Sequence, residues 1–109
     1  MSTFKPTSKN ELVTAVDEWN NGDWTGDHIS TWDTSLITDM SYLFAGTAIS
    51  HSSFNDDISN WDTSAVTNTT KMFYYATTFS QNLNNWDVSL VIDMFEINVF
   101  WCISVRREY

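Results

Sequence analysis

The sequence is poor in cysteine, glycine and basic side chains, and each shortage excludes a class of protein. Cys102 is the only cysteine among the 109 residues, so no disulfide can form within the chain. The three glycines, Gly22, Gly26 and Gly46, fit neither a phosphate-binding loop nor the G-x-S-x-G turn that carries a nucleophilic serine. No nucleophile stands beside an evident base. The sequence therefore predicts a protein that is not an enzyme and that needs no cofactor.

Charge and hydropathy restrict the possible partners. Five basic against fourteen acidic side chains give a net charge of -9, which repels phosphate backbones and anionic lipid surfaces. No stretch approaches the roughly 18 apolar residues of a membrane helix, and the N-terminal "MSTFKPTSKNEL" lacks the apolar run of a secretory signal. We expect no nucleic-acid partner, no membrane span and no signal peptide in this chain.

What the chain does contain is one motif written three times, as "STWDTSLITD", "SNWDTSAVTN" and "NNWDVSLVID". The tryptophans at positions 32, 61 and 86 are 29 and 25 residues apart, a period typical of solenoid repeats. Residues that are apolar except for Thr69 recur in fixed phase with them, which predicts that Trp32, Trp61 and Trp86 pack in a core rather than form an exposed ligand-stacking ladder. The recurring positions are Ile29, Ile58, Leu83, Ile37, Val66, Val91, Met40, Thr69, Met94, Leu43, Met72 and Ile97.

Each repeat changes its periodicity partway along, which predicts two kinds of element. "ISNWDTS" is short, contains β-favouring residues and ends in turn formers, so it predicts one brief strand. "TDMSYLFAG" places Met40, Leu43 and Phe44 on one helical face. The expected fold is an α/β repeat solenoid of about three coils, similar to leucine-rich repeats, with a short strand and a short helix per coil. The residues expected to cap the helices are Asp39, Asn68 and Asp93.

The same patterns predict where the parts of the chain begin and end. Ser8 and Glu11 form a capping box ahead of an apolar stripe, and Gly22 follows it, so an amphipathic helix is expected over residues 8–20. Residues 1–28 would form an N-terminal cap helix and linker, and residues 29–96 the repeat solenoid. Residues 97–109, which contain "INVFWCISV", would form an atypical apolar C-terminal tail or cap.

With "ISNWDTSAVTN", "MFYYATTFSQNL" and "NNWDVSLVIDM", the chain resembles the BspA-like, mycoplasma-lipoprotein-type surface repeat family over about residues 27–95. That family has leucine-rich-repeat-like units of roughly 25 residues and is a domain of unknown function. The resemblance implies an extracellular or cell-surface location, and adhesion or partner binding without catalytic residues.

Two functions are therefore considered for the repeats. The first is non-catalytic binding of a protein or glycan by an exposed aromatic surface, which the sequence places at Tyr42, Tyr74 and Tyr75 on the helical side. The second is a structural role, with self-assembly into a homo-oligomer through the apolar residues 97–109.

A third possibility rests on the aspartate that follows each repeat tryptophan. Stacked coils would place Asp33, Asp62 and Asp87 in a column, and clustered carboxylates suit a calcium ion. A serine stands two residues after each of them, however, and this pattern favours a local turn in which the aspartate caps its own corner. Threonine columns that begin at Thr34 and Thr38 are only two repeats deep, which disfavours an ice-binding surface.

Overall fold

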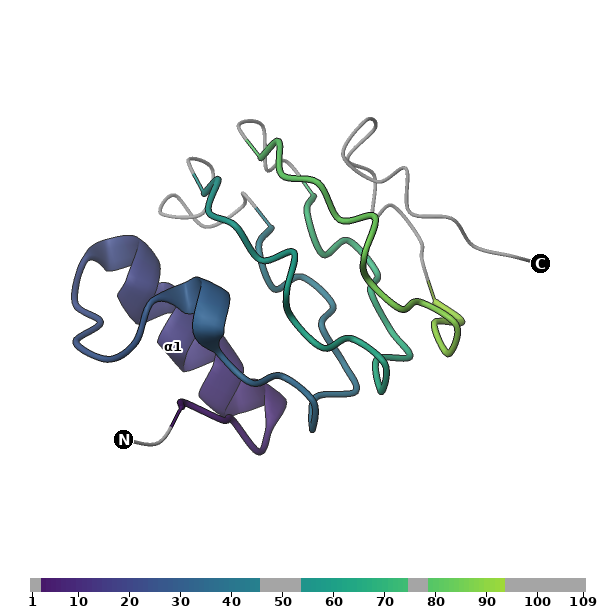
Figure 1. Cartoon of the computed structure of the whole chain (residues 1–109), viewed down its shortest axis with the longest axis horizontal. Coiled ribbons are helices and arrows are strands. Elements are labelled where there is room, and N and C mark those ends of the chain that lie inside the picture. Colours follow the sequence, from purple (N-terminus) through teal and green to yellow (C-terminus); the bar gives the residue numbers. More distant parts are fainter. Residues whose placement is uncertain (1–2, 46–53, 75–78, 94–109) are drawn as a thin grey trace.

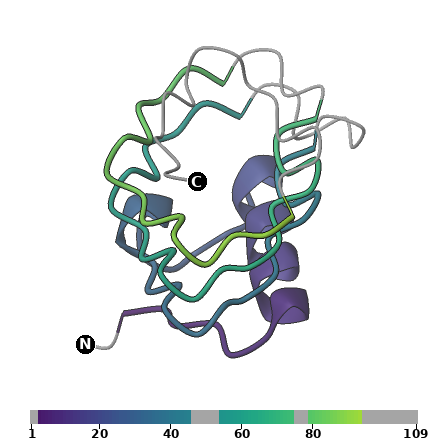
Figure 2. The ribbon, with the colours of Figure 1, turned by 90° about the vertical axis from the view of Figure 1, so that its right-hand side faces the viewer.

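Two helices are the regular elements of residues 3–45, 54–74 and 79–93, the part of the chain that the computed structural model describes. Helix α1 spans Lys9–Asn21, and the 3-10 helix η1 spans Ile29–Thr31. Both lie at one end of the molecule, and the three repeats follow beside them as irregular loops of chain (Figure 1). Figure 2 shows the same loops stacked behind one another when they are viewed along the stack.

Helix α1 has the two caps that its sequence predicts, and its bounds differ from the expected ones by a single residue at each end. The Ser8 hydroxyl accepts from the Glu11 N–H at 3.2 Å, and the Glu11 carboxylate accepts from the Thr7 N–H at 2.6 Å. At the other end Gly22 has a φ of 82°, which is the left-handed conformation common at helix C-termini and easiest for glycine to adopt. The apolar face buries Leu12, Ala15 and Val16.

The repeats pair with one another in the register that the tryptophan spacing sets. Asp39 bridges Asn68, and Asn68 bridges Asp93, both in parallel, so the paired residues are again 29 and 25 positions apart. Around the first bridge, Met40 N–H donates to the Asn68 carbonyl at 2.9 Å and Thr67 N–H donates to the Thr38 carbonyl at 2.8 Å. The equal phase of the three sequences is therefore a spatial alignment.

The expected α/β solenoid with a strand and a helix in every coil is nevertheless wrong. In the described ranges the only β-type pairing consists of the two isolated bridges, with no strand and no sheet, and "ISNWDTS" is irregular. The segment "TDMSYLFAG" forms a tight turn over residues 41–44 instead of a helix. The chain is a small folded body with one α-helix in its described part and a radius of gyration of 12.9 Å.

Backbone geometry explains why the predicted short helices do not form. Tyr42 and Lys71, which occupy the same position in successive repeats, have φ angles of 61° and 52°, and a left-handed residue interrupts a right-handed helix. The N–H groups of Tyr42 and Phe44 donate to carbonyls of the next repeat rather than four residues back. Asp39 and Asn68 consequently cap turns: their side chains accept from the N–H groups two residues on, at 2.8 and 2.9 Å.

The core runs through all three repeats and is rich in aromatic rings. Phe44 stacks on Phe54 at 4.3 Å and on Phe73 at 5.6 Å between ring centroids, and Phe73 stacks on Phe79 at 4.4 Å. The three repeat tryptophans are buried, as predicted. The predicted core positions are also buried wherever the structure describes them; Met94 and Ile97 lie outside the described residues, as does the whole segment 97–109.

Each buried indole has a hydrogen-bond partner in the preceding part of the chain. Trp61 Nε1 donates to the Ile29 carbonyl at 2.8 Å, and Trp86 Nε1 donates to the Ile58 carbonyl at 2.9 Å. Trp32 uses the Asp27 carbonyl, at 3.1 Å. Because a buried N–H without a partner is destabilising, these bonds join neighbouring repeats and join the first repeat to the linker after α1.

Candidate functional site

The aspartates after the tryptophans cap turns at the corners of the repeats, as the sequence predicted. The Oδ1 atoms of Asp33, Asp62 and Asp87 each accept from the N–H of the serine two residues on, at 3.0 Å in all three repeats. Each corner is also closed by an N–H to carbonyl bond of 3.0 Å across four residues, such as Ile37 to Thr34. The three corners therefore have the same local geometry.

Buried threonines connect one corner to the next. Thr34 Oγ1 donates to the Asp62 carbonyl at 3.0 Å, and Thr63 Oγ1 donates to the Asp87 carbonyl at 3.1 Å. The third repeat has Val88 at this position, which is buried but carries no hydroxyl. These threonines are thus internal connectors rather than part of an exposed column.

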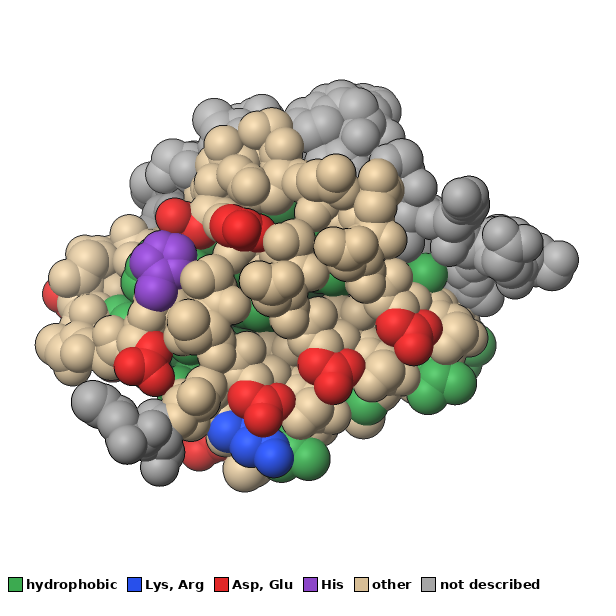
Figure 3. Space-filling model, in the orientation of Figure 1, with side chains coloured by type: hydrophobic (Ala, Val, Ile, Leu, Met, Phe, Trp, Pro, Cys, Tyr) green, Lys and Arg blue, Asp and Glu red, His purple; other side chains and the backbone are tan. Residues whose placement is uncertain are grey.

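Asp33 is half-buried, whereas Asp62 and Asp87 are exposed. Figure 3 shows several acidic side chains following one another along one face of the molecule, with basic side chains near one end of that row. Lys5 Nζ lies 3.8 Å from Asp33 Oδ2. Hydrogen bonds from Ser35, and then the charge of Lys5, hold the pKa of Asp33 below its ordinary value. Among the described residues, no three acidic, histidine or cysteine side chains come together in a group that could hold a metal ion.

Two of the three predicted tyrosines come together at the turns that replace the expected helices. Tyr42 is 52% exposed. Lys71 Nζ lies 4.8 Å from the ring centroid of Tyr74 and 6.0 Å from that of Tyr42, so one ammonium contacts both rings. Tyr75 lies outside the described residues. We call Tyr42, Lys71 and Tyr74 the Tyr-Lys-Tyr surface.

Sequence reasoning missed Lys71, although a signal was present. Lys71 stands ten residues after its repeat tryptophan, as Tyr42 does, so the two share a position in the repeat. It also missed three exposed aliphatic side chains, Leu36, Leu90 and Ile92, the last of which is 77% exposed. Leu36 and Leu90 both stand four residues after a tryptophan, at the tip of a corner turn.

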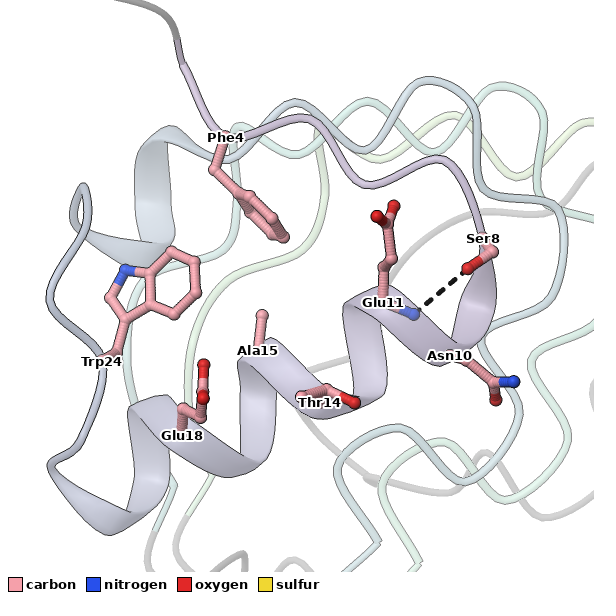
Figure 4. Close-up of a pocket in the computed structure, with 8 residues that line it drawn as sticks. All are labelled: Phe4, Ser8, Asn10, Glu11, Thr14, Ala15, Glu18 and Trp24. Carbon is pink, nitrogen blue, oxygen red and sulfur yellow. Dashed lines mark hydrogen bonds between the residues drawn. The ribbon is translucent and has the colours of Figure 1, made fainter.

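A hollow of about 380 Å³ lies between α1 and the N-terminal segment. Figure 4 shows Phe4 and Trp24 on one side of it, Ala15 at its floor, and Glu11 and Glu18 on the helix at either side of Ala15. The hollow could not be read from the sequence, because Phe4 and Trp24 lie on opposite sides of the helix in sequence and belong to neither the helical pattern nor the repeats. The remaining lining residues are Ser8, Asn10 and Thr14.

No described helix has both the length and the apolar character to cross a membrane. No curated protein and no solved structure matches the chain. Residues 13–100 do match the model of a family described as Mycoplasma protein of unknown function, DUF285. The matched range includes most of α1 and all three tryptophan repeats, and it covers well over half of the chain. The chain therefore belongs to the DUF285 family of Mycoplasma proteins of unknown function.

Proposed function

We propose that this protein is a non-catalytic binding module that holds a protein or glycan partner on its Tyr-Lys-Tyr surface. The observation that carries the proposal is that the Lys71 ammonium lies within cation–π range of both the Tyr42 and the Tyr74 ring, at 6.0 and 4.8 Å from their centroids. Tyrosine offers a large contact area for a small loss of side-chain entropy. An ammonium held against the rings adds a hydrogen-bond donor that suits carbonyl and hydroxyl oxygens.

The backbone under this surface supports the same proposal. Tyr42 and Lys71 are the two residues other than glycine with positive φ in the described part of the chain, and such a conformation costs an L-residue about 1 to 2 kcal/mol. Glycine or asparagine would adopt it more easily. Strained residues gather at functional sites more often than elsewhere, so large side chains at both positions favour a role outside folding.

The sequence resemblance to BspA-like surface repeats supports adhesion at an extracellular or cell surface as the setting for this binding. The repeat carries no catalytic residue in that family, and the module proposed here binds without converting its partner. The acidic remainder of the protein makes the Lys71 ammonium a local exception in a chain of net charge -9, which favours partners that combine hydroxyl or carbonyl groups with an apolar face.

The experiment uses two variants, each of which removes one part of the Tyr-Lys-Tyr surface. Lys71→Gly removes the ammonium and relieves the positive φ, so the protein should keep its fold. Tyr42→Ala removes the exposed ring. Wild-type protein is first applied to a glycan array and to an array of secreted and surface proteins, and each hit is then measured by biolayer interferometry. Both variants should lower the affinity for a true partner about five- to thirtyfold, as expected for contacts of about 1 to 2 kcal/mol.

The matched control is Lys5→Gly, which removes the same charge from the N-terminal segment, where Lys5 pairs with Asp33. It should leave partner affinity unchanged. Partners that bind wild type, Lys71→Gly and Tyr42→Ala equally well would show that the Tyr-Lys-Tyr surface is not the contact region.

A further inference from the structure

The hollow beside α1 combines aromatic rings with carboxylates and has no basic residue in its lining. Its eight lining residues include Phe4 and Trp24 as the aromatic wall and Glu11 and Glu18 as the charged groups. Glu11, Ala15 and Glu18 are four and three residues apart, so they follow one stripe of the helix. The two carboxylates therefore stand on either side of the small Ala15 side chain, as Figure 4 shows.

The aromatic wall is fixed by contacts that do not depend on a ligand. Trp24 Nε1 donates to the Asp27 carbonyl at 2.7 Å, and Trp24 N–H donates to the Glu18 carbonyl at 3.1 Å. The ring passes so close to Gly26 that a Cβ there would lie 2.9 Å from it. The Phe4 ring meets Trp24 edge to face with centroids 4.9 Å apart.

The N-terminal segment beside the hollow is equally well held. The Phe4 carbonyl accepts from the Asp33 N–H at 2.9 Å, which fixes the N-terminal segment over the first repeat. The Glu11 carboxylate accepts from the Thr7 N–H and hydroxyl at 2.6 and 3.0 Å. These partners of Glu11 are neutral, so they do not cancel its negative charge.

From these contacts we propose that the hollow beside α1 is a binding site for an organic cation, an alkylammonium or guanidinium group. The aromatic faces attract a cation through their quadrupoles, and the apolar floor accepts the carbon atoms around the charge. Glu11 and Glu18 supply the counter-charge, and no lining residue repels it. A hard metal ion such as Mg²⁺ or Ca²⁺ is a less suitable ligand, because it binds oxygen ligands and retains its water molecules, so the aromatic rings would contribute little to its affinity.

Two sources could deliver this chemistry: a free quaternary amine, or a lysine or arginine side chain of a polypeptide. The site is distinct from the Tyr-Lys-Tyr surface, since the two have no residue in common. Cation binding and partner capture on that surface can therefore be lost independently.

The test follows the Trp24 indole N–H by two-dimensional NMR while one of three cations is added. These are choline, Nα-acetyl-lysine methylamide and Nα-acetyl-arginine methylamide, and the last two keep their charged side chains. The comparison compound is 3,3-dimethyl-1-butanol, which has the shape of choline without its charge. At least one cation should shift the Trp24 signal at millimolar concentrations in a saturable way, and added sodium chloride should weaken the effect. Choline binding alone would indicate a small-molecule ligand, whereas preference for the amino-acid amides would indicate a basic peptide; either result supports the proposal.

Charge-matched variants distinguish specific binding in the hollow from a general effect of the protein's net charge. Glu18→Gln should weaken cation binding about three- to fivefold, and Trp24→Leu about tenfold. Asp17→Asn removes the same charge from the same helix outside the hollow and should leave the affinity unchanged. The far-UV circular dichroism of each variant reports whether it is folded.

Several results would overturn the proposal. An unshifted Trp24 signal with every cation, a response to the neutral alcohol equal to that of choline, or equal losses from Glu18→Gln and Asp17→Asn would each exclude a cation site here.

Discussion

Replacing Thr63 by valine should test how the repeats are joined. Thr63 is buried, and its hydroxyl donates to the Asp87 carbonyl of the next repeat at 3.1 Å. Valine has nearly the same shape and stands at the equivalent position in the third repeat, as Val88. The substitution therefore removes one hydrogen bond between repeats while it keeps the volume of the side chain.

The expected loss follows from that single bond. An intramolecular hydrogen bond contributes about 1 kcal/mol net, and a carbonyl that loses a partner in a partly buried place raises the loss to roughly 1 to 3 kcal/mol. Valine regains part of this through its apolar surface, so the free energy of unfolding should fall by about 1 to 2 kcal/mol. For a chain of this size, each 1 kcal/mol lowers the melting temperature by roughly 4 °C or more.

Urea unfolding followed by far-UV circular dichroism measures the change, and equal m-values would show that the unfolded states are comparable. Thr25→Val is the matched control, because Thr25 is exposed in the linker. Thr34→Val, which breaks the same bond one repeat earlier, should behave like Thr63→Val. If Thr63→Val is as stable as Thr25→Val, the threonine hydroxyls do not hold the repeats together.

Two further predictions concern the helix cap and the acid limb of stability. Gly22→Ala should destabilise the protein by about 1 kcal/mol through backbone strain alone, because φ is 82° and no atom lies within 4 Å of the added Cβ; an unchanged urea midpoint would contradict this cause. Hydrogen bonds from Ser35, Ser59 and Ser89 hold the pKa values of Asp33, Asp57 and Asp87 below the ordinary aspartate value. Since these pKa values are lower in the folded state, their contribution is complete above about pH 4 and is lost as the pH falls below it. The urea midpoint should therefore decline in that range, and Asp57→Asn should flatten the decline, whereas a midpoint independent of pH there would refute the assignment.

The repeat register and the core could be predicted because they depend on phase, which the sequence displays directly. The tryptophans at 29- and 25-residue spacing correspond to the parallel bridges between Asp39, Asn68 and Asp93. The corner turns could also be predicted, since Asp33 and Ser35 are neighbours in sequence and their bond is local. The caps of α1 were predictable for the same reason.

The absence of the short helices could not be predicted, because contacts between neighbouring repeats determine whether this segment forms a helix or a turn. Met40, Leu43 and Phe44 have the spacing of a helical face, and a tight turn also buries all three. What excludes the helix is that Tyr42 adopts positive φ and that its N–H pairs with Thr70 of the next repeat. Neither fact is visible in a single repeat.

The candidate site was likewise predictable only in part. Exposure of Tyr42 followed from its place between core positions, but Lys71 joins the surface only because successive repeats align. The hollow beside α1 was hidden further, since Phe4 and Trp24 meet across the helix without any common periodicity. Contacts between segments of unrelated pattern require coordinates.

The indole bonds also restrict how such a chain can lengthen by tandem duplication. Trp61 and Trp86 donate to the carbonyl three residues before the preceding tryptophan, so a copied unit keeps its bonds only when it brings that residue in the same phase. A duplication that copies only part of a unit and omits this residue leaves a buried N–H without an acceptor, at a loss of about 1 to 3 kcal/mol. Insertions elsewhere in the unit do not affect this bond, which is consistent with units of 29 and 25 residues in one molecule. During evolution by duplication, this hydrogen bond would therefore constrain the positions of the tryptophan and its acceptor within the unit, whereas the length of the unit could change.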